Sequence, residues 1–289
     1  MDELGSRLNE GVRGISNRVN AFNQRNTSTL DEAVESYMQR AEEEANNPNY
    51  LPGIQTGYPG FDKVTLGLAK NKLYIFAAPP GWGKTAWLLC LALVCLNQGK
   101  KVLFLSLEMS IDEMVERMLC ISTKVNYSDF RKRKWSPDDR EKLQKERARI
   151  KGLVASKNFT MVEMRKPTLA QIEAKLIDHQ VNPGYDVVFI DYIALNKLSM
   201  PDGDANQNAL TIGAELERWK QTYPAAFAVA TQMNQKWNSR KGKRPELGDL
   251  YYGSSLGFGA DLVAYIYHEC KVKPKSTNRD AEIIIRKNR

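Results

Sequence analysis

The sequence predicts an α/β fold in which a mostly parallel sheet carries helices on both faces. From Leu51 onwards, short apolar runs alternate with helical segments, which is the pattern of parallel strands connected by helices. One run, 73–77, leads directly into a glycine-containing turn and then an apolar helical run. Two further runs, 102–107 and 186–191, bring an acid to their carboxyl ends, at the edge where open α/β sheets bind ligands.

Length and charge limit the interpretation. The 289 residues are enough for one large α/β domain, which we place at 51–289, and a small helical segment at 1–50. Lysine and arginine outnumber aspartate and glutamate by 42 to 34, so the formal net charge is +8. This excess of positive charge favours a polyanionic partner.

The cysteines and the apolar segments indicate a cytoplasmic protein without a membrane partner. Cys90, Cys95, Cys120 and Cys270 show no C-x-x-C spacing, so we expect buried, reduced thiols rather than metal ligands or disulfides. The N-terminus is polar, and the apolar stretch 86–96 is too short to span a bilayer.

Two helical patterns precede the α/β region. Apolar residues recur at helical spacing from Leu4 to Phe22, and this helix either packs on its own domain or needs a partner chain. Thr29 and Glu32 form a capping-box pattern that opens a second helix, which runs to about Ala45 with an apolar stripe. A lone helix on a polar tether has to bury that stripe, and a neighbouring subunit would cover it.

The segment 78–85 has the character of a phosphate-binding loop. Gly81 and Gly83 permit the backbone angles and the close approach that a triphosphate requires. The helix starting at about Lys84 adds free N–H groups and the positive end of its dipole, and the Thr85 hydroxyl is placed to ligate Mg²⁺. The alternative is an ordinary strand-to-helix turn. The candidate nucleotide-binding residues are Pro80, Gly81, Trp82, Gly83, Lys84 and Thr85.

Two acids complete the predicted site. Glu108 follows the strand 102–107 and is our candidate general base, although a glutamate here could instead help to cap the helix that follows Ser110. Asp191 ends the strand 186–191, where an acid can hold the Mg²⁺ of the same triphosphate, usually through a water.

A basic loop follows a later strand. We expect a polar loop over 196–208, a helix over 209–223 and a strand over 227–230 that delivers Gln232 to the same sheet edge. Basic residues then surround Trp237, and they are Lys236, Arg240, Lys241, Lys243 and Arg244. Such a loop suits a phosphate backbone and a stacked base, but a solvated charge run has the same composition.

Other charged and titratable residues are expected to have surface or structural roles. The stretch 131–149 predicts a charged, solvated helix. His179 and His268 are isolated, which favours surface or structural roles over catalysis. Two final strands are expected at 262–267 and 281–285.

With these pieces placed, the chain resembles the ATPase domain of the DnaB-type hexameric replicative DNA helicases, a RecA-like P-loop fold. The resemblance covers about residues 30–289. It rests on 53–62, on 77–85 with the family's alanine at Ala78, on 106–110, on Ile190-Asp191-Tyr192, on Gln232 with Asn234, on Arg244-Pro245 with Asp249-Leu250, and on 261–267 and 281–289.

The resemblance implies ATP and Mg²⁺ as ligands, single-stranded DNA as a partner and a hexameric ring in a bacterial or phage-infected cytoplasm. It implies γ-phosphate sensing by Gln232 and places on Lys287 and Arg289 a lysine and an arginine finger that reach the neighbour's ATP. The helix 29–45 resembles a linker helix that docks on the adjacent subunit. The resemblance adds Tyr251, Tyr252 and Gly253 to the candidate DNA-binding residues of the basic loop.

Three features depart from the family pattern. About 50 residues stand where the family has a large helical N-terminal domain, so a primase or a helicase loader is a candidate partner without a predicted docking site. Tyr251-Tyr252 replaces Arg-Glu, and tyrosines can hydrogen-bond a phosphate or stack on a base. The family continues past K-x-R into more strand, whereas Arg289 is terminal here, and a finger on a frayed end would be poorly held.

Two functions of different class fit these residues. The first is ATP hydrolysis at subunit interfaces that drives translocation on single-stranded DNA and unwinding of duplex during replication. The second is a nucleotide-switched, helicase-like protein that binds DNA or a partner without unwinding. A recombinase of the same fold is a third interpretation, against which the motif sequences argue.

Overall fold

The computed structural model describes residues 29–47, 50–154, 158–181, 184–194, 198, 200, 204–240, 242–251, 254–273 and 275–289. The helical pattern from Leu4 to Phe22 lies outside these residues. The chain divides into two compact units, one ending at Tyr50 and one beginning at Leu51. Among the described helices, none has the length and apolar character needed to cross a membrane.

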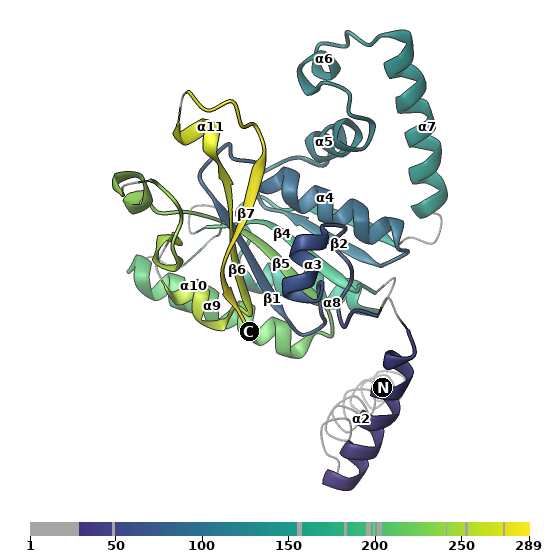
Figure 1. The fold of residues 1–289 in the computed structure, drawn as a ribbon, viewed down its shortest axis with the longest axis vertical. Helices are drawn as coiled ribbons and strands as arrows, with labels where there is room; N and C mark the ends of the chain where they lie inside the picture. The colour runs from purple at the N-terminus through teal and green to yellow at the C-terminus, as the bar shows by residue number, and fades with distance from the viewer. Residues whose placement is uncertain are drawn as a thin grey trace, which may run out of the picture. The chain divides into compact units, whose positions relative to one another are not determined.

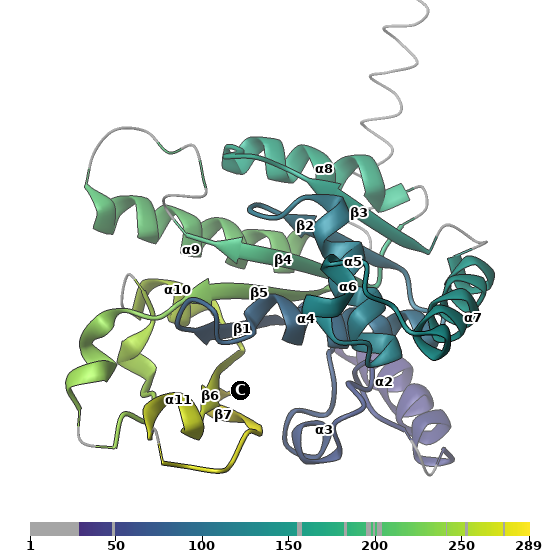
Figure 2. The same cartoon turned by 90° about the horizontal axis from the view of Figure 1, so that it is seen from above.

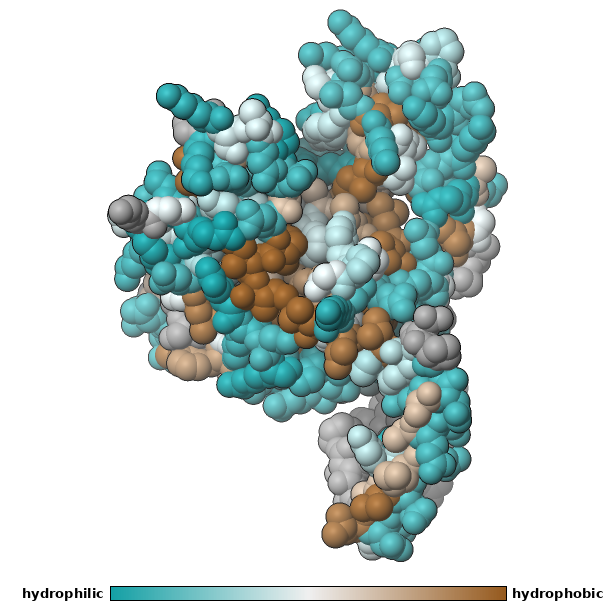
Figure 3. Space-filling view, in the orientation of Figure 1, coloured by the Kyte–Doolittle hydropathy of each residue, from teal (hydrophilic) through white to brown (hydrophobic). Residues whose placement is uncertain are grey.

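The described part of the first unit is one helix, α2 (Leu30–Ala45). Its start is capped reciprocally, because the Thr29 side chain accepts from the Glu32 N–H and the Glu32 side chain accepts from the Thr29 N–H. No residue of α2 is buried. The predicted helix and its capping box are confirmed. Its exposed apolar side chains lie along one side (Figure 3), and they are Leu30, Val34, Tyr37 and Met38.

The second unit is built on a seven-stranded sheet with the order β3-β2-β4-β5-β1-β6-β7 (Figure 1). Its strands are β1 (Leu73–Ala78), β2 (Val102–Ser106), β3 (Phe159–Glu163), β4 (Val187–Ile193), β5 (Ala226–Gln232), β6 (Leu262–His268) and β7 (Ala281–Asn288). All neighbouring strands run parallel except β6 and β7, which are antiparallel. The predicted α/β fold with a mostly parallel sheet is confirmed.

Helices cover both faces of this sheet, with α8 and α9 on one side and α3 and α4 on the other (Figure 2). The helices of this unit are α3 (Pro59–Thr65), α4 (Lys84–Asn97), α5 (Ile111–Thr123), α6 (Tyr127–Arg131), α7 (Pro137–Leu153), α8 (Leu169–Val181), α9 (Ala205–Thr222), α10 (Ser254–Gly259) and α11 (Glu269–Val272). Two short 3₁₀ helices, η3 (Gln235–Ser239) and η4 (Leu247–Asp249), follow β5.

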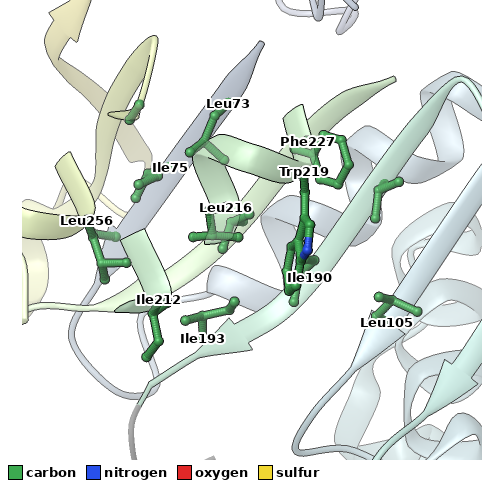
Figure 4. Close-up of a cluster of buried hydrophobic side chains, with 14 of the residues drawn as sticks. Leu73, Ile75, Leu105, Ile190, Ile193, Ile212, Leu216, Trp219, Phe227 and Leu256 are labelled. Carbon is green, nitrogen blue, oxygen red and sulfur yellow. The ribbon is translucent and has the colours of Figure 1, made fainter. Parts of the chain in front are cut away.

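The alternation of side chains along each strand makes two core layers. Leu73 and Ile75 of β1 enter one layer, together with Leu216 and Trp219 of α9 (Figure 4). Tyr74, which lies between Leu73 and Ile75 in β1, enters the other layer together with side chains of α4. Because both faces of the sheet are covered, the central strands read as continuous apolar runs rather than as alternating ones.

Several boundaries differ from the sequence prediction. The stretch 131–149 is not one helix, since α6 ends at Arg131 and α7 begins at Pro137, which follows the capping residue Ser136. The helix expected at 209–223 begins earlier, at Ala205, and strand β4 continues two residues beyond Asp191. The peptide bond between Asp191 and Tyr192 is cis.

The expectation of a loosely held C-terminus is wrong. The Arg289 N–H donates to the Asp261 carbonyl at 3.0 Å, and the Asn288 side chain donates to the Val64 carbonyl at 2.8 Å. Together with the pairing of Asn288 with Leu262 of β6, these bonds hold the backbone as far as Arg289, so its end is not frayed.

Candidate nucleotide site and basic loop

The turn between β1 and α4 has the backbone of a phosphate loop. Gly81 and Gly83 have φ of +72° and +90°, which is left-handed backbone that favours glycine. A Cβ atom at either position would meet nothing within 4 Å, so the turn borders open space. Helix α4 begins at Lys84 and aims its free N–H groups and the positive end of its dipole at that space.

Lys84 is held within the turn. Its Nζ donates to the carbonyls of Ala78 at 3.2 Å and Pro79 at 3.4 Å, and it lies 5.2 Å from the ring centroid of Tyr192. Burial lowers the pKa of Lys84, and the negative charges of Asp191 and Glu108 partly oppose that effect. The ammonium group is thus a buried donor beside two acids.

Asp191 lies beneath the turn as a buried carboxyl group with 1% of its surface exposed. Thr85 donates a side-chain hydrogen bond to it, while its Oδ1 has no hydrogen-bond partner. Burial raises the pKa of Asp191 to about 6, and the hydrogen bond from Thr85 and the charge of Lys84 lower it only in part. An orphaned buried carboxylate oxygen next to a threonine hydroxyl is a donor set that suits Mg²⁺.

A cavity of about 540 Å³ opens above these residues. Glu108 lines it from the end of β2, and Gln232 lines it from the end of β5, where its Nε2 donates to the Tyr192 hydroxyl at 2.7 Å. Ser110 and Glu113 form the capping box of α5, so that helix start has its own cap. The full lining is Pro80, Gly81, Gly83, Lys84, Thr85, Ala86, Glu108, Met109, Glu113, Arg117, Tyr192 and Gln232.

The basic loop, which we define as residues 233–251, is closed by an ion pair. Met233 and Leu250 form an isolated β-bridge at its base, and the Arg240 guanidinium donates to both oxygens of the buried Asp249 at 2.8 and 2.9 Å. Arg244 pairs with Glu282 at 2.5 Å and lies 4.9 Å from the Tyr267 ring centroid. These two arginines therefore brace the loop.

The remaining predicted DNA contacts differ in exposure. Lys236 is exposed, Lys243 is half-buried, and Tyr251 retains 36% of its surface. Lys241, Tyr252 and Gly253 lie outside the described residues.

Lys287 and Arg289 are not brought to the cavity. Lys287 donates to the carbonyls of Gly257 at 2.7 Å and Phe258 at 3.0 Å. Asn288 pairs with Leu262, which pairs with Tyr74 near the start of β1, whereas the phosphate loop follows the other end of that strand. The five residues from Tyr74 to Ala78 alone span about 13 Å at the usual rise of a strand.

The sequence profile described as "DnaB-like helicase C terminal domain" matches residues 53–289. The chain belongs to this family. Its members among curated proteins include a probable plasmid replicative DNA helicase of Chlamydia psittaci, 27% identical over 242 residues that make up 83% of this chain and 52% of that protein. The replicative DNA helicase DnaC of Bacillus subtilis is 28% identical over 295 aligned positions, which cover 100% of this chain and 63% of that protein. The chain thus spans about half to two-thirds of the length of these relatives.

Solved structures agree with the fold of the DnaB-like domain. One, described as an ATPase domain, has a TM-score of 0.80 at 23% identity and covers 91% of this chain and 92% of its own. A second, described as a DnaB-like replicative helicase and its interactions with primase, has a TM-score of 0.76 at 24% identity and covers 91% of this chain and 62% of its own. At this identity the likeness shows the fold alone.

Sequence reasoning missed four residues around this DnaB-like site. Glu113 and Arg117 line the cavity from α5, one helical turn apart, a spacing that could have placed both on the face that follows Glu108. Arg117 has a buried Nε without a hydrogen-bond partner. Lys271 donates to the Gly81 carbonyl, and His268 Nε2 lies 3.2 Å from the Trp82 carbonyl oxygen. The last two contacts join segments that are far apart in the sequence, so no local sequence pattern predicts them.

Proposed function

We propose that this DnaB-like chain is the ATP-hydrolysing motor of a replicative DNA helicase. The observation that carries the proposal is one cavity lined by a glycine-containing loop, a lysine, Glu108 and a glutamine, with the buried Asp191 hydrogen-bonded to Thr85 of the same lining. The loop and the lysine follow β1, Glu108 follows β2, and Gln232 ends β5. Asp191 lies two residues before the end of β4, so all four strands contribute near the edge where parallel sheets bind ligands. Membership of the DnaB-like helicase family supports the choice of ATP over other phosphate ligands.

The residues present fit a nucleotide with Mg²⁺. The open space beside Gly81 and Gly83 would take the phosphates, and Thr85 and Asp191 would hold the metal ion. A Mg²⁺ held by these two residues would also bind phosphate oxygens and water. When bound, Mg²⁺ neutralises charge that develops on the transferred phosphoryl group.

The side chains around the cavity divide the chemistry. Lys84 would leave the carbonyls of Ala78 and Pro79 to donate to the β- and γ-phosphate oxygens. Glu108 would accept a proton from water as the water oxygen bonds to the γ-phosphorus and the bond to the β,γ-bridging oxygen breaks. Gln232 would contact the γ-phosphate and, through the Tyr192 hydroxyl, register its loss.

Lys287 and Arg289 are proposed to act on a neighbouring copy. Both lie at the sheet end away from their own cavity, and their backbone is held by β6 and Asp261. A cation fixed in this way can stabilise phosphoryl charge only in a second subunit. The proposal therefore requires an oligomer, and a closed ring of heterologous contacts, such as a hexamer, satisfies it.

Helix α2 supports assembly of the same kind. It exposes an apolar side and carries six acidic residues against one arginine. The ATPase unit has a cavity of about 600 Å³ with apolar Leu93, Val94 and Ile121 in its lining. Arg149, which is paired with Glu146, lines both this cavity and a smaller one beside it. We propose that α2 of one copy occupies this groove of the next, with the apolar side of α2 against Leu93, Val94 and Ile121.

Single-stranded DNA is the proposed polyanionic partner of the basic loop. Lys236 and Lys243 are its candidate phosphate contacts, and Tyr251 its candidate stacking residue. Arg240 and Arg244 would shape the loop through their ion pairs, with part of their charge facing DNA. Lys241, Tyr252 and Gly253 complete the set on sequence grounds.

A second candidate is a nucleotide-switched protein that binds DNA without unwinding it. The specific observation in its favour is that acids already hold both arginines of the loop, which leaves fewer free cations to grip a strand.

The test is the ATPase rate of the full chain with and without single-stranded DNA, alongside its mass in solution with a non-hydrolysable ATP analogue. Strong stimulation by DNA and a ring-sized particle support the motor. A monomer with slow turnover that DNA does not change contradicts it.

A further inference from the structure

The phosphate loop touches the basic loop through two tryptophans. The ring centroids of Trp82 and Trp237 are 5.3 Å apart with an interplanar angle of 75°, which is an edge-to-face contact. Trp82 precedes Gly83 and Lys84 in the phosphate loop, and Trp237 lies in η3 of the basic loop. Both rings are half-buried and pack against the core.

The end of β6 and the following helix α11 also contact Trp82. The centroids of Tyr267 and His268 lie 6.2 and 6.0 Å from that of Trp82, and Lys271 Nζ lies 5.8 Å from the same ring. The same segment binds the loop backbone, through Lys271 at the Gly81 carbonyl and His268 at the Trp82 carbonyl. Because β6 and α11 hold Trp82 and the loop backbone, a change in the phosphate loop that moves Trp82 also changes its contact with Trp237.

The basic loop would move as one piece. The Arg240 N–H donates to the Trp237 carbonyl at 3.3 Å, and the Arg240 side chain is bonded to Asp249. Asp249 is next to Leu250, which pairs with Met233 at the base of the loop. A displacement of Trp237 therefore reaches Lys236 on one side and the Arg240–Asp249 pair on the other.

We propose that Trp237 is a positioning residue that couples the two ligand sites. Through its contact with Trp82, nucleotide on the phosphate loop changes the affinity of the basic loop for single-stranded DNA, and DNA changes the affinity for nucleotide by the same factor. This inference rests on the proposed function. It adds a second connection to the one from Gln232 to Tyr192, which starts at β5 and involves neither tryptophan.

A plainer role for Trp237 is to stack on a DNA base. The two roles predict different effects on the coupling factor, which is the ratio of the DNA affinities with and without nucleotide. A stacking residue contributes to DNA affinity equally with and without nucleotide, so its loss leaves the coupling factor unchanged. A coupling residue contributes to the ratio of the two affinities, so its loss brings that ratio towards one.

The experiment measures the affinity of the full chain for a fluorescently labelled oligo-dT by anisotropy, with and without a non-hydrolysable ATP analogue and Mg²⁺. The variants are Trp237→Ala, Trp237→Phe as the conservative rescue, and Trp135→Ala as a matched control. Trp135 also makes an aromatic contact, with Phe130 at 5.3 Å, but lies between α6 and α7.

We expect Trp237→Ala to reduce the coupling factor about fivefold, while nucleotide affinity without DNA and the basal ATPase rate change by less than about twofold. Trp237→Phe should retain most of the coupling, and Trp135→Ala all of it. Coupling that persists in Trp237→Ala overturns the inference, as does a loss of DNA affinity with an unchanged coupling factor. If the ATPase rate of the wild-type chain does not depend on DNA, the proposed function is refuted, and with it the coupling that this inference assigns to Trp237.

Discussion

Replacing Asp191 by asparagine should make the chain inactive and more stable. Burial raises the pKa of Asp191 from 3.8 to about 6, because Thr85 and Lys84 offset only part of the lost hydration. Above pH 6 the folded chain therefore holds a buried carboxylate that the unfolded chain would expose to water. One pKa unit corresponds to about 1.4 kcal/mol, so this charge lowers the free energy of unfolding by about 3 kcal/mol at pH 8.

The pH dependence has a definite sign. Because the folded-state pKa is raised, the folded chain binds more protons than the unfolded chain between pH 3.8 and about 6. Stability falls as the pH rises through that window, and the penalty is absent below it. Asparagine keeps the shape without the charge, so Asp191→Asn should gain about 3 kcal/mol at pH 8 and about half of that at pH 5. The gain at pH 8 corresponds to a rise in Tm of roughly 6 °C.

The assay is thermal unfolding of both proteins, without nucleotide or Mg²⁺, at pH 5 and pH 8. Asp249→Asn is the matched control, because Asp249 is equally buried but bonded to Arg240 through both oxygens. Its loss should destabilise the fold by about 1 to 3 kcal/mol. A variant Asp191→Asn that is less stable than the wild type at pH 8, or that gains equally at both pH values, would refute the reasoning.

Three further predictions concern activity and assembly. Glu108→Gln should bind an ATP analogue normally but turn over about 10² to 10⁴ times more slowly, whereas Lys84→Ala should lose binding as well; equilibrium binding and steady-state ATPase rates distinguish the two. Arg289→Ala should lower the rate by about 10³ to 10⁵, and mixing it with Glu108→Gln should restore part of the activity if Arg289 acts on a neighbour. Tyr37→Asp, on the apolar side of α2, should leave the Tm unchanged but reduce the mass of the oligomer measured by light scattering. An unchanged mass would contradict the proposed docking of α2 in the groove of the neighbouring copy.

The sequence predicts the central strands and the phosphate loop because their signals are local. Strands such as β1 and β4 are buried on both faces, so their apolar runs are continuous. The capping box of α2 also lies within four residues. Strand β3 was missed because it is an edge strand, half-buried throughout, and its sequence Phe-Thr-Met-Val-Glu mixes polar and apolar residues.

The candidate site was predicted where strand ends supply its residues and missed where long-range contacts do. Glu108 follows β2, Gln232 ends β5, and Asp191 lies two residues before the end of β4. Parallel strands bring such positions together. The contact of Trp82 with Trp237 depends on the fold of the basic loop, which no periodicity reveals. Composition alone also could not show that Arg240 and Arg244 are paired with acids, because Asp249 and Glu282 lie nine and 38 residues away.

The most direct test of the account is strand displacement on a forked DNA with ATP and Mg²⁺, comparing the wild-type chain with Glu108→Gln. The account predicts that the wild type releases the displaced strand and that Glu108→Gln, which still binds nucleotide, does not. ATP hydrolysis by the wild type without any displacement would contradict the helicase motor and favour the nucleotide-switched DNA-binding protein.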